Sequence, residues 1–505
     1  MKKIGSGFLI ALLLLFISFS LGQGAEPKNV ILVIGDGMGP QAVGLAIYYN
    51  LFMNGPGKPL NLEKLMAAGN TGYCLTYQYG TVVTDSASAA TALASGVKTR
   101  DAIIGKDHNG RSMKSLVDIA NSLGKSTGVI STTRLTHATP AAFYAHSIHR
   151  ERENEIASQL IERGDLTLAF SGGARHFIPQ GTKVEDHPDL KGIGKAAGWG
   201  SSTRKDSQDL IISAKNKGYS IIANEKEILA LDTGKTEKVL GLFSISDFPS
   251  AIDRQPQYLT GVPTLPQLTA KGLEILKKNP KGFFLMVEGG QVDYVEHGND
   301  VASVLHEMLE LDQAIGVAMT FAEKNPDTLV VVTADHDTGG LAIAYSSHQP
   351  PQALKLPSGE TWQTKYNFGE KGIFDKMAKQ KKSFLKMAID SKGNPAAFKK
   401  EVEENSAFTI TEEQAAALLA RDSKGGFQST KDYGEFYGRG NPAPLMGRLF
   451  GKEMKTAWAV GTHTHTPVMI FGTGPGAERF RGLMDNTWVP QIIAQEWGAV
   501  LPAPK

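Results

Sequence analysis

Three short apolar runs constrain the fold of this chain more than any other feature, because each leads directly into glycines and acidic residues. The runs are residues 30–34, 283–286 and 328–333. A nearly continuous apolar run of this length is typical of a parallel strand that is covered on both faces. In open α/β sheets, functional groups gather beyond the carboxyl ends of such strands. We therefore expect an α/β fold with its chemistry at these strand ends.

The segment after residues 283–286 carries the densest group of polar side chains. Two consecutive glycines follow Glu288 and allow a tight turn, so we expect Glu288 on the turn itself. Asp293 and His297 are four positions apart and share one face if a helix begins here. A carboxylate and an imidazole on one face suit a cation such as zinc. The alternative is a helix start with ordinary surface charges.

The other two runs also end in candidate ligands. Asp36 follows residues 30–34, and there it either serves a site at the strand end or caps the next helix. Asp335 and His336 follow residues 328–333. Adjacent residues can share one metal ion when they lie in a loop, so this pair is a second candidate site.

An alanine-rich segment, residues 87–95, predicts a helix that ends at Gly96. Ser86 stands at the start of this helix, where its hydroxyl can cap the helix, act as a nucleophile, or do both. The free N–H groups and positive potential of a helix N-terminus also suit a bound phosphate.

A further predicted strand, residues 126–130, leads to His137 and Thr139, which offer an imidazole and a hydroxyl oxygen. A proline follows them and fits the first turn of a helix, which we expect to continue to Arg150. The guanidinium of Arg150 suits bidentate contacts with phosphate. The alternative is a solvated charge within a charged stretch.

The last predicted strand, residues 468–471, is preceded by His463 and His465. The collected candidates form three sets by their ligand chemistry. Two sets of nitrogen and oxygen donors suit zinc, and one set of oxygen donors suits magnesium. The sets are Asp293, His297 and His463 (or His465); Asp36, Asp335 and His336; and Asp36, Thr139 and Glu288. So many candidates together predict a polynuclear metal site.

Composition argues against several other classes of function. Lys and Arg total 53 against 51 Asp and Glu, a balance that offers no bulk attraction for nucleic acid or an anionic membrane. Cys74 is the single cysteine, so no internal disulfide forms, and we expect a small buried side chain rather than a nucleophile.

The N-terminus has the pattern of a secretory signal peptide over residues 1–24. A short basic start precedes the apolar residues 8–21, and small residues follow at 22–25. The alternative, an uncleaved anchor, is disfavoured because the apolar run is shorter than the roughly 20 residues of a spanning helix. We expect an exported chain, periplasmic or secreted, without stable membrane insertion after cleavage.

These motifs together resemble those of the alkaline phosphatases. The resemblance rests on residues 35–39, 84–88, 137–140, 288–297 and 333–336 and on the final histidine motif, and it covers most of the mature chain. It implies one α/β catalytic domain over residues 25–505, although length alone suggests about three domains. The implied fold is a three-layer sandwich, with a central, mostly parallel sheet flanked by helices.

Two further expectations concern the insertion and the assembly. Residues 345–456 alternate helical segments with loops rich in lysine, glycine and proline, and we interpret them as an insertion that covers part of the site. The resemblance also implies two zinc ions, one magnesium ion and, in many members, a homodimer.

By this resemblance, Ser86 is the nucleophile that forms a phosphoserine during hydrolysis of phosphate monoesters, and Arg150 binds the phosphoryl oxygens. The ion at Asp36 would activate Ser86, and the ion at Asp293 would stabilise the leaving oxygen. Counting back from the glycine and proline at 474–475 favours His463 over His465 as a ligand. His137 and Tyr294 occupy positions that vary within the family, so pH optimum and magnesium dependence stay open.

The main alternative is a phosphodiesterase of the same superfamily, because loops that exclude larger substrates cannot be recognised in sequence. A sulfatase is disfavoured, since Ser86 lacks the Cys/Ser-x-Pro-x-Arg setting of a sulfatase nucleophile. A metal- or phosphate-binding module without catalysis predicts a missing ligand or nucleophile, and none is missing. We expect phosphate monoesters as substrates and no nucleic-acid partner.

Overall fold

The computed structural model describes residues 26–193, 200–254, 261–421 and 441–501. The predicted signal peptide, residues 1–24, lies outside these ranges. Across the described part of the chain, no helix combines the length and the apolar character needed to cross a membrane.

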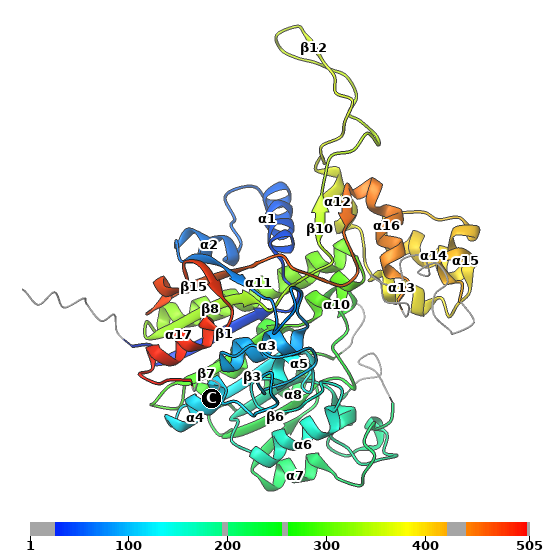
Figure 1. Cartoon of the computed structure of the whole chain (residues 1–505). Coiled ribbons are helices and arrows are strands. Elements are labelled where there is room, and N and C mark those ends of the chain that lie inside the picture. Colours follow the sequence, from blue (N-terminus) through cyan, green and yellow to red (C-terminus); the bar gives the residue numbers. More distant parts are fainter. Residues whose placement is uncertain (1–25, 194–199, 255–260, 422–440, 502–505) are drawn as a thin grey trace, which may run out of the picture.

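A ten-stranded sheet forms the centre of the molecule (Figure 1), in the order β16-β2-β15-β8-β1-β7-β3-β4-β6-β5. Strand β15 runs antiparallel to both of its neighbours, and the other neighbouring pairs are parallel. The strands are β1 (Asn29–Gly35), β2 (Thr71–Leu75), β3 (Ser126–Arg134), β4 (Leu168–Gly172), β5 (Tyr219–Ile222), β6 (Lys238–Leu242), β7 (Phe283–Gly289), β8 (Thr328–Ala334), β15 (Val468–Thr473) and β16 (Gly482–Asp485). The predicted, mostly parallel sheet is confirmed.

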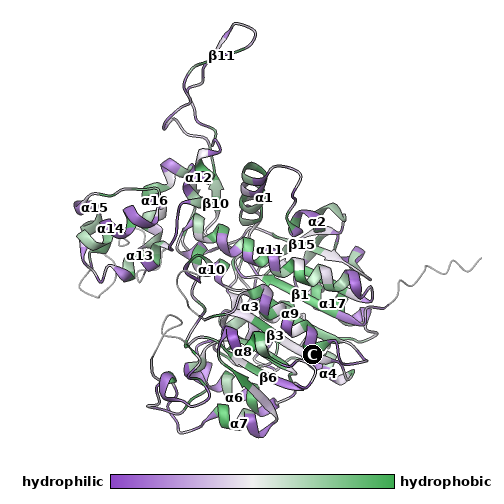
Figure 2. Ribbon diagram, turned by 180° about the vertical axis from the view of Figure 1, so that it is seen from behind, coloured by the Kyte–Doolittle hydropathy of each residue, from purple (hydrophilic) through white to green (hydrophobic). Residues whose placement is uncertain are grey.

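Helices cover the sheet and complete the predicted three-layer sandwich. One group packs around α9 and α11, and another packs around α3, α4 and α17. Hydrophobic residues concentrate in the central strands and in the helix faces turned toward them (Figure 2). The helices are α1 (Pro40–Asn54), α2 (Asn61–Ala67), α3 (Ser86–Ser95), α4 (Leu116–Ser122), α5 (Ala138–Ala141), α6 (Glu153–Arg163), α7 (Leu210–Asn216), α8 (Glu225–Ala230), α9 (Leu265–Leu276), α10 (Gln291–His297), α11 (Val301–Lys324) and α17 (Trp488–Glu496).

The three apolar runs form the innermost strands. Every residue of β1, β7 and β8 is buried, because helices cover both faces of these strands. This burial explains why their sequences are continuously apolar instead of alternating. In β7 the strand extends through Gly289, so Glu288 belongs to the strand end and not to the turn.

The predicted helix that continues to Arg150 is wrong. Helix α5 covers only Ala138–Ala141, and Arg150 lies in a turn just before α6. The chain leaves the helix because Ser147 pairs with Ile104: each backbone N–H donates to the other residue's carbonyl at 2.9 Å. This bridge keeps the backbone extended where the helix would have continued, and it carries Arg150 back toward the site.

The described parts of residues 345–456, namely 345–421 and 441–456, form a helical lobe beside the sheet and a hairpin that extends from it (Figure 1). The first turn of α13 is tied to the main body, because Ser383 N–H donates to Asp253 Oδ1 at 2.9 Å and Phe384 N–H to Asp300 Oδ2 at 2.7 Å. The elements of this region are β11 (Leu354–Lys355), β12 (Thr361–Trp362), α12 (Gly372–Ala378), α13 (Phe384–Asp390), α14 (Pro395–Asn405), α15 (Glu412–Leu419) and α16 (Ala443–Met454).

Candidate active site

The strand order brings the predicted ligands to one edge of the sheet. Strands β8, β1, β7 and β3 are consecutive neighbours. Gly35 pairs with Ala334 of β8, and Ile34 pairs with Glu288 of β7. Asp36, Asp335 and Glu288 therefore emerge at nearly the same level, although they are far apart in sequence.

The first group of ligand atoms joins Asp36, Asp335 and His336, all fully buried. His336 Nε2 lies 3.2 Å from Asp335 Oδ2 and 3.5 Å from Asp36 Oδ1. Ser86 Oγ lies 3.2 Å from the same nitrogen. The predicted nucleophile thus stands directly beside one predicted metal site.

The second group joins Asp293, His297 and His463. Helix α10 carries Asp293 and His297 on one face, as predicted, with His297 Nε2 3.3 Å from Asp293 Oδ1. His463 Nε2 approaches the same oxygen at 3.6 Å from the two-residue strand β14 (His463–Thr464). His465 is exposed, so the structure brings His463 and not His465 into this group.

A third group lies on the other side of Asp36. Thr139 Oγ1 is 3.5 Å from Asp36 Oδ2. One ligand atom each of Glu288, Asp36 and His137 lie within 4.8 Å of one another. Ser131 and Thr133 donate to Glu288 Oε2, whereas Oε1 has no hydrogen-bond partner within the described part of the chain.

The three histidines are held so that Nε2 points into the site. In each ring, Nδ1 contacts an oxygen atom of the chain. When Nδ1 donates a hydrogen bond to a carbonyl, Nε2 is unprotonated and its lone pair can bind a metal ion. The contacts are His297 Nδ1 to Gly461 O (2.7 Å), His463 Nδ1 to Thr84 O (2.8 Å) and His336 Nδ1 to Thr338 Oγ1 (3.2 Å).

The site fits cations on electrostatic grounds. Asp36 Oδ1, Asp335 Oδ2 and Glu288 Oε1 are buried and have no hydrogen-bond partner among the residues that the structure describes, which is costly for a charged group unless a cation is bound. Burial and neighbouring carboxylates raise the pKa of Asp36 and of Asp335 well above its ordinary value. Burial raises the pKa of Glu288 to about 7. Cations would relieve both the repulsion and the missing contacts.

Ser86 is the first residue of α3, and the cap is Asp85 instead. The Asp85 side chain accepts from Ser88 N–H at 2.9 Å, which leaves the Ser86 hydroxyl available for chemistry. Sequence reasoning gave Asp85 no role, although an acidic residue directly before an alanine-rich helix is itself a capping signal.

Arg150 reaches the site from the turn before α6. Its Nη1 lies 3.3 Å from Asp85 Oδ2, and its Nη2 donates to His137 Nε2 at 2.8 Å. Burial and the Arg150 charge lower the pKa of His137 well below its ordinary value, so this ring is neutral. A neutral ring that accepts at Nε2 carries its proton on Nδ1, and this nitrogen faces Asp36 Oδ2 at 4.0 Å.

Comparison with known proteins agrees with this geometry. The family described as alkaline phosphatase matches residues 27–498. The sequence is 32% identical to alkaline phosphatase 4 of Bacillus subtilis (strain 168) over 484 residues, which cover 93% of this chain and 88% of that protein. The structure is similar to Thermus thermophilus alkaline phosphatase, with a TM-score of 0.78 and 26% identity over 95% of this chain and 94% of the other.

The structure is also similar to the cold-active alkaline phosphatase of a Shewanella species, with a TM-score of 0.69 and 28% sequence identity. This match covers 92% of this chain and 98% of the Shewanella chain. The family match spans nearly the whole chain, and the clustered carboxylates, imidazoles and serine suit a metal-dependent phosphatase. This chain therefore belongs to the alkaline phosphatase family, whose members hydrolyse phosphate monoesters.

Proposed function

We propose that this enzyme hydrolyses phosphate monoesters through a phosphoserine at Ser86, in a centre that holds two zinc ions and one magnesium ion. The observation that carries the proposal is the position of Ser86 Oγ, 3.2 Å from His336 Nε2 at the convergence of Asp36 and Asp335. A serine hydroxyl is a weak nucleophile at neutral pH, and it becomes effective when a neighbouring group stabilises its alkoxide.

The reaction proceeds in two displacements at phosphorus. Ser86 Oγ loses its proton to solvent and attacks, the bond from phosphorus to the ester oxygen breaks, and this oxygen takes up a proton from solvent and leaves as the alcohol. Water then loses a proton and attacks the phosphoserine, the serine oxygen leaves and regains a proton, and inorganic phosphate is released. Two inversions retain the configuration at phosphorus.

Arg150 binds two nonbridging oxygens of the phosphoryl group. Its contacts with Asp85 and His137 fix the plane of the guanidinium before substrate binds, which reduces the entropy lost on binding. A preoriented guanidinium favours bidentate recognition of phosphate over contact with a single oxygen.

The zinc ligands are two mixed sets of carboxylate and imidazole donors. We assign them as Asp293, His297 and His463, and as Asp36, Asp335 and His336. When bound, these ions supply positive charge that lowers the pKa of a hydroxyl group and neutralises charge on the phosphoryl oxygens.

Magnesium is assigned to Asp36, Thr139 and Glu288 because these residues offer only oxygen donors, which Mg²⁺ prefers. His137 lies in the same cluster, but its Nε2 accepts from Arg150, so its Nδ1 carries a proton and cannot bind a cation. The oxygen-only set thus accounts for the cluster without an imidazole ligand.

The test uses the purified full chain, its zinc and magnesium content and its turnover of 4-nitrophenyl phosphate. We expect Ser86→Ala to keep the metal content and to abolish turnover. Ser95→Ala is the matched control, because Ser95 lies in the same helix and its buried hydroxyl has no hydrogen-bond partner in the ranges that the structure describes. Undiminished turnover of Ser86→Ala would refute the assignment.

Removing the metal tests the second half of the proposal. A chelator should abolish turnover, and zinc together with magnesium should restore it more fully than either ion alone. Full activity in the chelated protein would contradict the metal assignment.

We further propose that residues 1–24 direct export, that residues 25–505 form one catalytic domain, and that residues 345–456 are an insertion covering part of the site. The export proposal rests on the sequence pattern. N-terminal sequencing of protein secreted by its host tests it, and a mature chain that retains residue 1 would contradict it. A homodimer, proposed by analogy with the family, is tested by sedimentation.

A further inference from the structure

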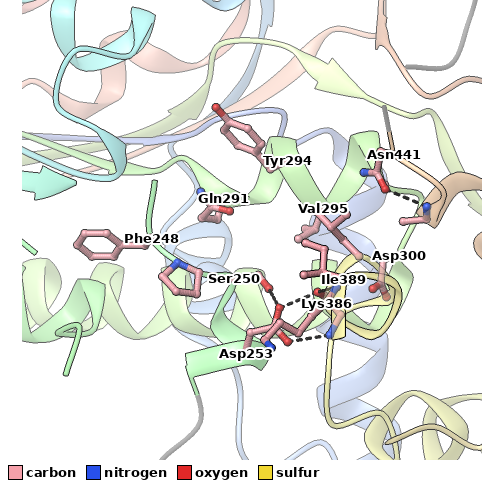
Figure 3. A pocket seen from close by; sticks show the side chains of 15 residues that line it. Phe248, Ser250, Asp253, Gln291, Tyr294, Val295, Asp300, Lys386, Ile389 and Asn441 are labelled. Atoms are coloured by element: carbon pink, nitrogen blue, oxygen red, sulfur yellow. Dashed lines mark hydrogen bonds between the residues drawn. The ribbon is translucent and has the colours of Figure 1, made fainter. Parts of the chain in front are cut away.

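A cavity of about 510 Å³ lies between the main body and the helical lobe. Figure 3 shows Phe248 and Ser250 on one side of it and Val295 and Ile389 on the other. Further parts of its wall come from α10, from α13 and from Ala443, the first residue of α16. A cavity of this volume is within the ~300–1,000 Å³ range of small-molecule sites.

The walls of this cavity favour an apolar occupant. The surface of the cavity is mostly apolar, although polar and apolar residues line it in equal number, and the charged side chains already have partners. Asp253 accepts from Ser250 and Ser383, and Lys386 donates to Asp390 at 2.5 Å. Asp300, the third charged lining residue, accepts from the side chain of Gln380 and from the N-terminus of α13. An additional charged ligand would have to displace one of these partners.

Tyr294 connects the cavity with the phosphate-binding groups. Its side chain lines the cavity, and its ring lies 5.9 Å from the ring of His137, centroid to centroid. His137 in turn contacts Arg150 at 2.8 Å. Arg134 donates to the Tyr294 hydroxyl at 3.2 Å and keeps the ring in this position. The Tyr294 side chain is therefore next to both the cavity and the groups that would bind the phosphoryl oxygens.

We propose that the cavity binds the alcohol portion of the substrate and that it selects phosphate monoesters of bulky apolar alcohols, such as aryl alcohols. This inference rests on the proposed phosphomonoesterase function, which supplies the position of the phosphoryl group. The ester oxygen leaves from Ser86 toward the Asp293 group, and the apolar group of the alcohol packs against Tyr294, which follows Asp293 in α10, and against Val295 and Leu385. Burial of this apolar surface favours the large ester, and a small alkyl ester gains nothing from the cavity.

The experiment narrows the cavity from the lobe side. Ile389 and Leu385 project from α13 at its rim and are 62% and 39% exposed, so tryptophan at either position is compatible with folding. We would measure kcat/KM of the full-length enzyme for 1-naphthyl phosphate and for ethyl phosphate in Ile389→Trp and Leu385→Trp. Ile212→Trp is the matched control, because Ile212 is 53% exposed on helix α7, outside the cavity lining.

The measured quantity is the ratio of the two kcat/KM values, normalised to the unsubstituted enzyme. The chemical difference between the two leaving groups cancels in this comparison. We expect the ratio to fall about tenfold in at least one cavity variant. The inhibition constant for inorganic phosphate should stay within twofold, and Ile212→Trp should leave the ratio unchanged.

An unchanged ratio in both cavity variants, or an equal fall for both esters, overturns the assignment of the cavity. Failure of the proposed function has a different signature, since the unsubstituted enzyme would then turn over neither ester.

Discussion

The substitution Gly39→Ala tests how the turn after β1 supports the metal site. Gly39 caps α1 with φ −72° and ψ 168°, a conformation that alanine adopts without strain. A Cβ atom at this position would lie 1.6 Å from Asp337 Oδ1 and 2.6 Å from Asp337 Cγ. The carboxylate of Asp337 must therefore move, and any effect of the substitution comes from this clash.

The cost of the movement follows from the contacts of Asp337. Its Oδ2 accepts a hydrogen bond from Thr464 Oγ1 at 2.5 Å, and Thr464 directly follows the predicted zinc ligand His463. Loss of a hydrogen bond to a charged group costs about 1.5–3 kcal/mol. Overpacking of a buried site adds about 1–3 kcal/mol. We expect a destabilisation of about 3–5 kcal/mol in total, and zinc affinity at the His463 site weakened by roughly 10- to 100-fold.

Gly44→Ala provides the matched control within the same helix. No atom of the described residues lies within 4 Å of a Cβ at this position, which is in the interior of α1. Alanine there should stabilise the protein by about 0.5–1 kcal/mol, because it restricts the unfolded chain and favours the helix. Both substitutions replace glycine with alanine, but Gly39→Ala is expected to lower the stability and Gly44→Ala to raise it.

The assay is urea unfolding at pH 8 with zinc and magnesium in constant excess, followed by tryptophan fluorescence, together with zinc titration of the metal-free protein. Equal midpoints for the two variants would refute the reasoning. Gly39→Ala with lower stability but normal zinc affinity would refute the link from Asp337 to His463.

Three further predictions concern single side chains. Cys74 is fully buried, and burial raises the pKa of its thiol to about 12. A thiol reagent at pH 8 should therefore label Cys74 only after denaturation, and labelling of the native protein would contradict this prediction. Arg150→Ala should raise the inhibition constant for inorganic phosphate by about 10- to 100-fold, through loss of two charge-assisted hydrogen bonds, with metal content unchanged; an unaltered constant would exclude Arg150 from phosphate binding. Burial raises the pKa of Glu307 to about 8, so the folded state binds this proton more tightly than the unfolded chain. Stability should therefore fall as the pH rises from about 4 to about 8, and Glu307→Gln should gain about 5 kcal/mol above pH 9 and nothing below pH 4; parallel pH profiles would rule this out.

The sequence by itself determined the central strands and most of the candidate site. Strands β1, β7 and β8 were recognisable because burial on both faces requires a continuous apolar run, which is a local property. Asp293 and His297 were placed on one helix face by their spacing alone. The last two strands at one end of the sheet, β2 and β16, were missed, since they are short and partly exposed and carry no continuous apolar run.

Only the tertiary structure decided which side chains meet. The antiparallel direction of β15, the approach of His463 to Asp293, and the path that brings Arg150 to Asp85 all depend on contacts between residues distant in sequence. The Ile104–Ser147 bridge overrode the helix expected before Arg150 because two backbone hydrogen bonds fixed an extended segment there. Such pairings have no local signature, since their free energy comes from contacts that exist only after the sheet has assembled.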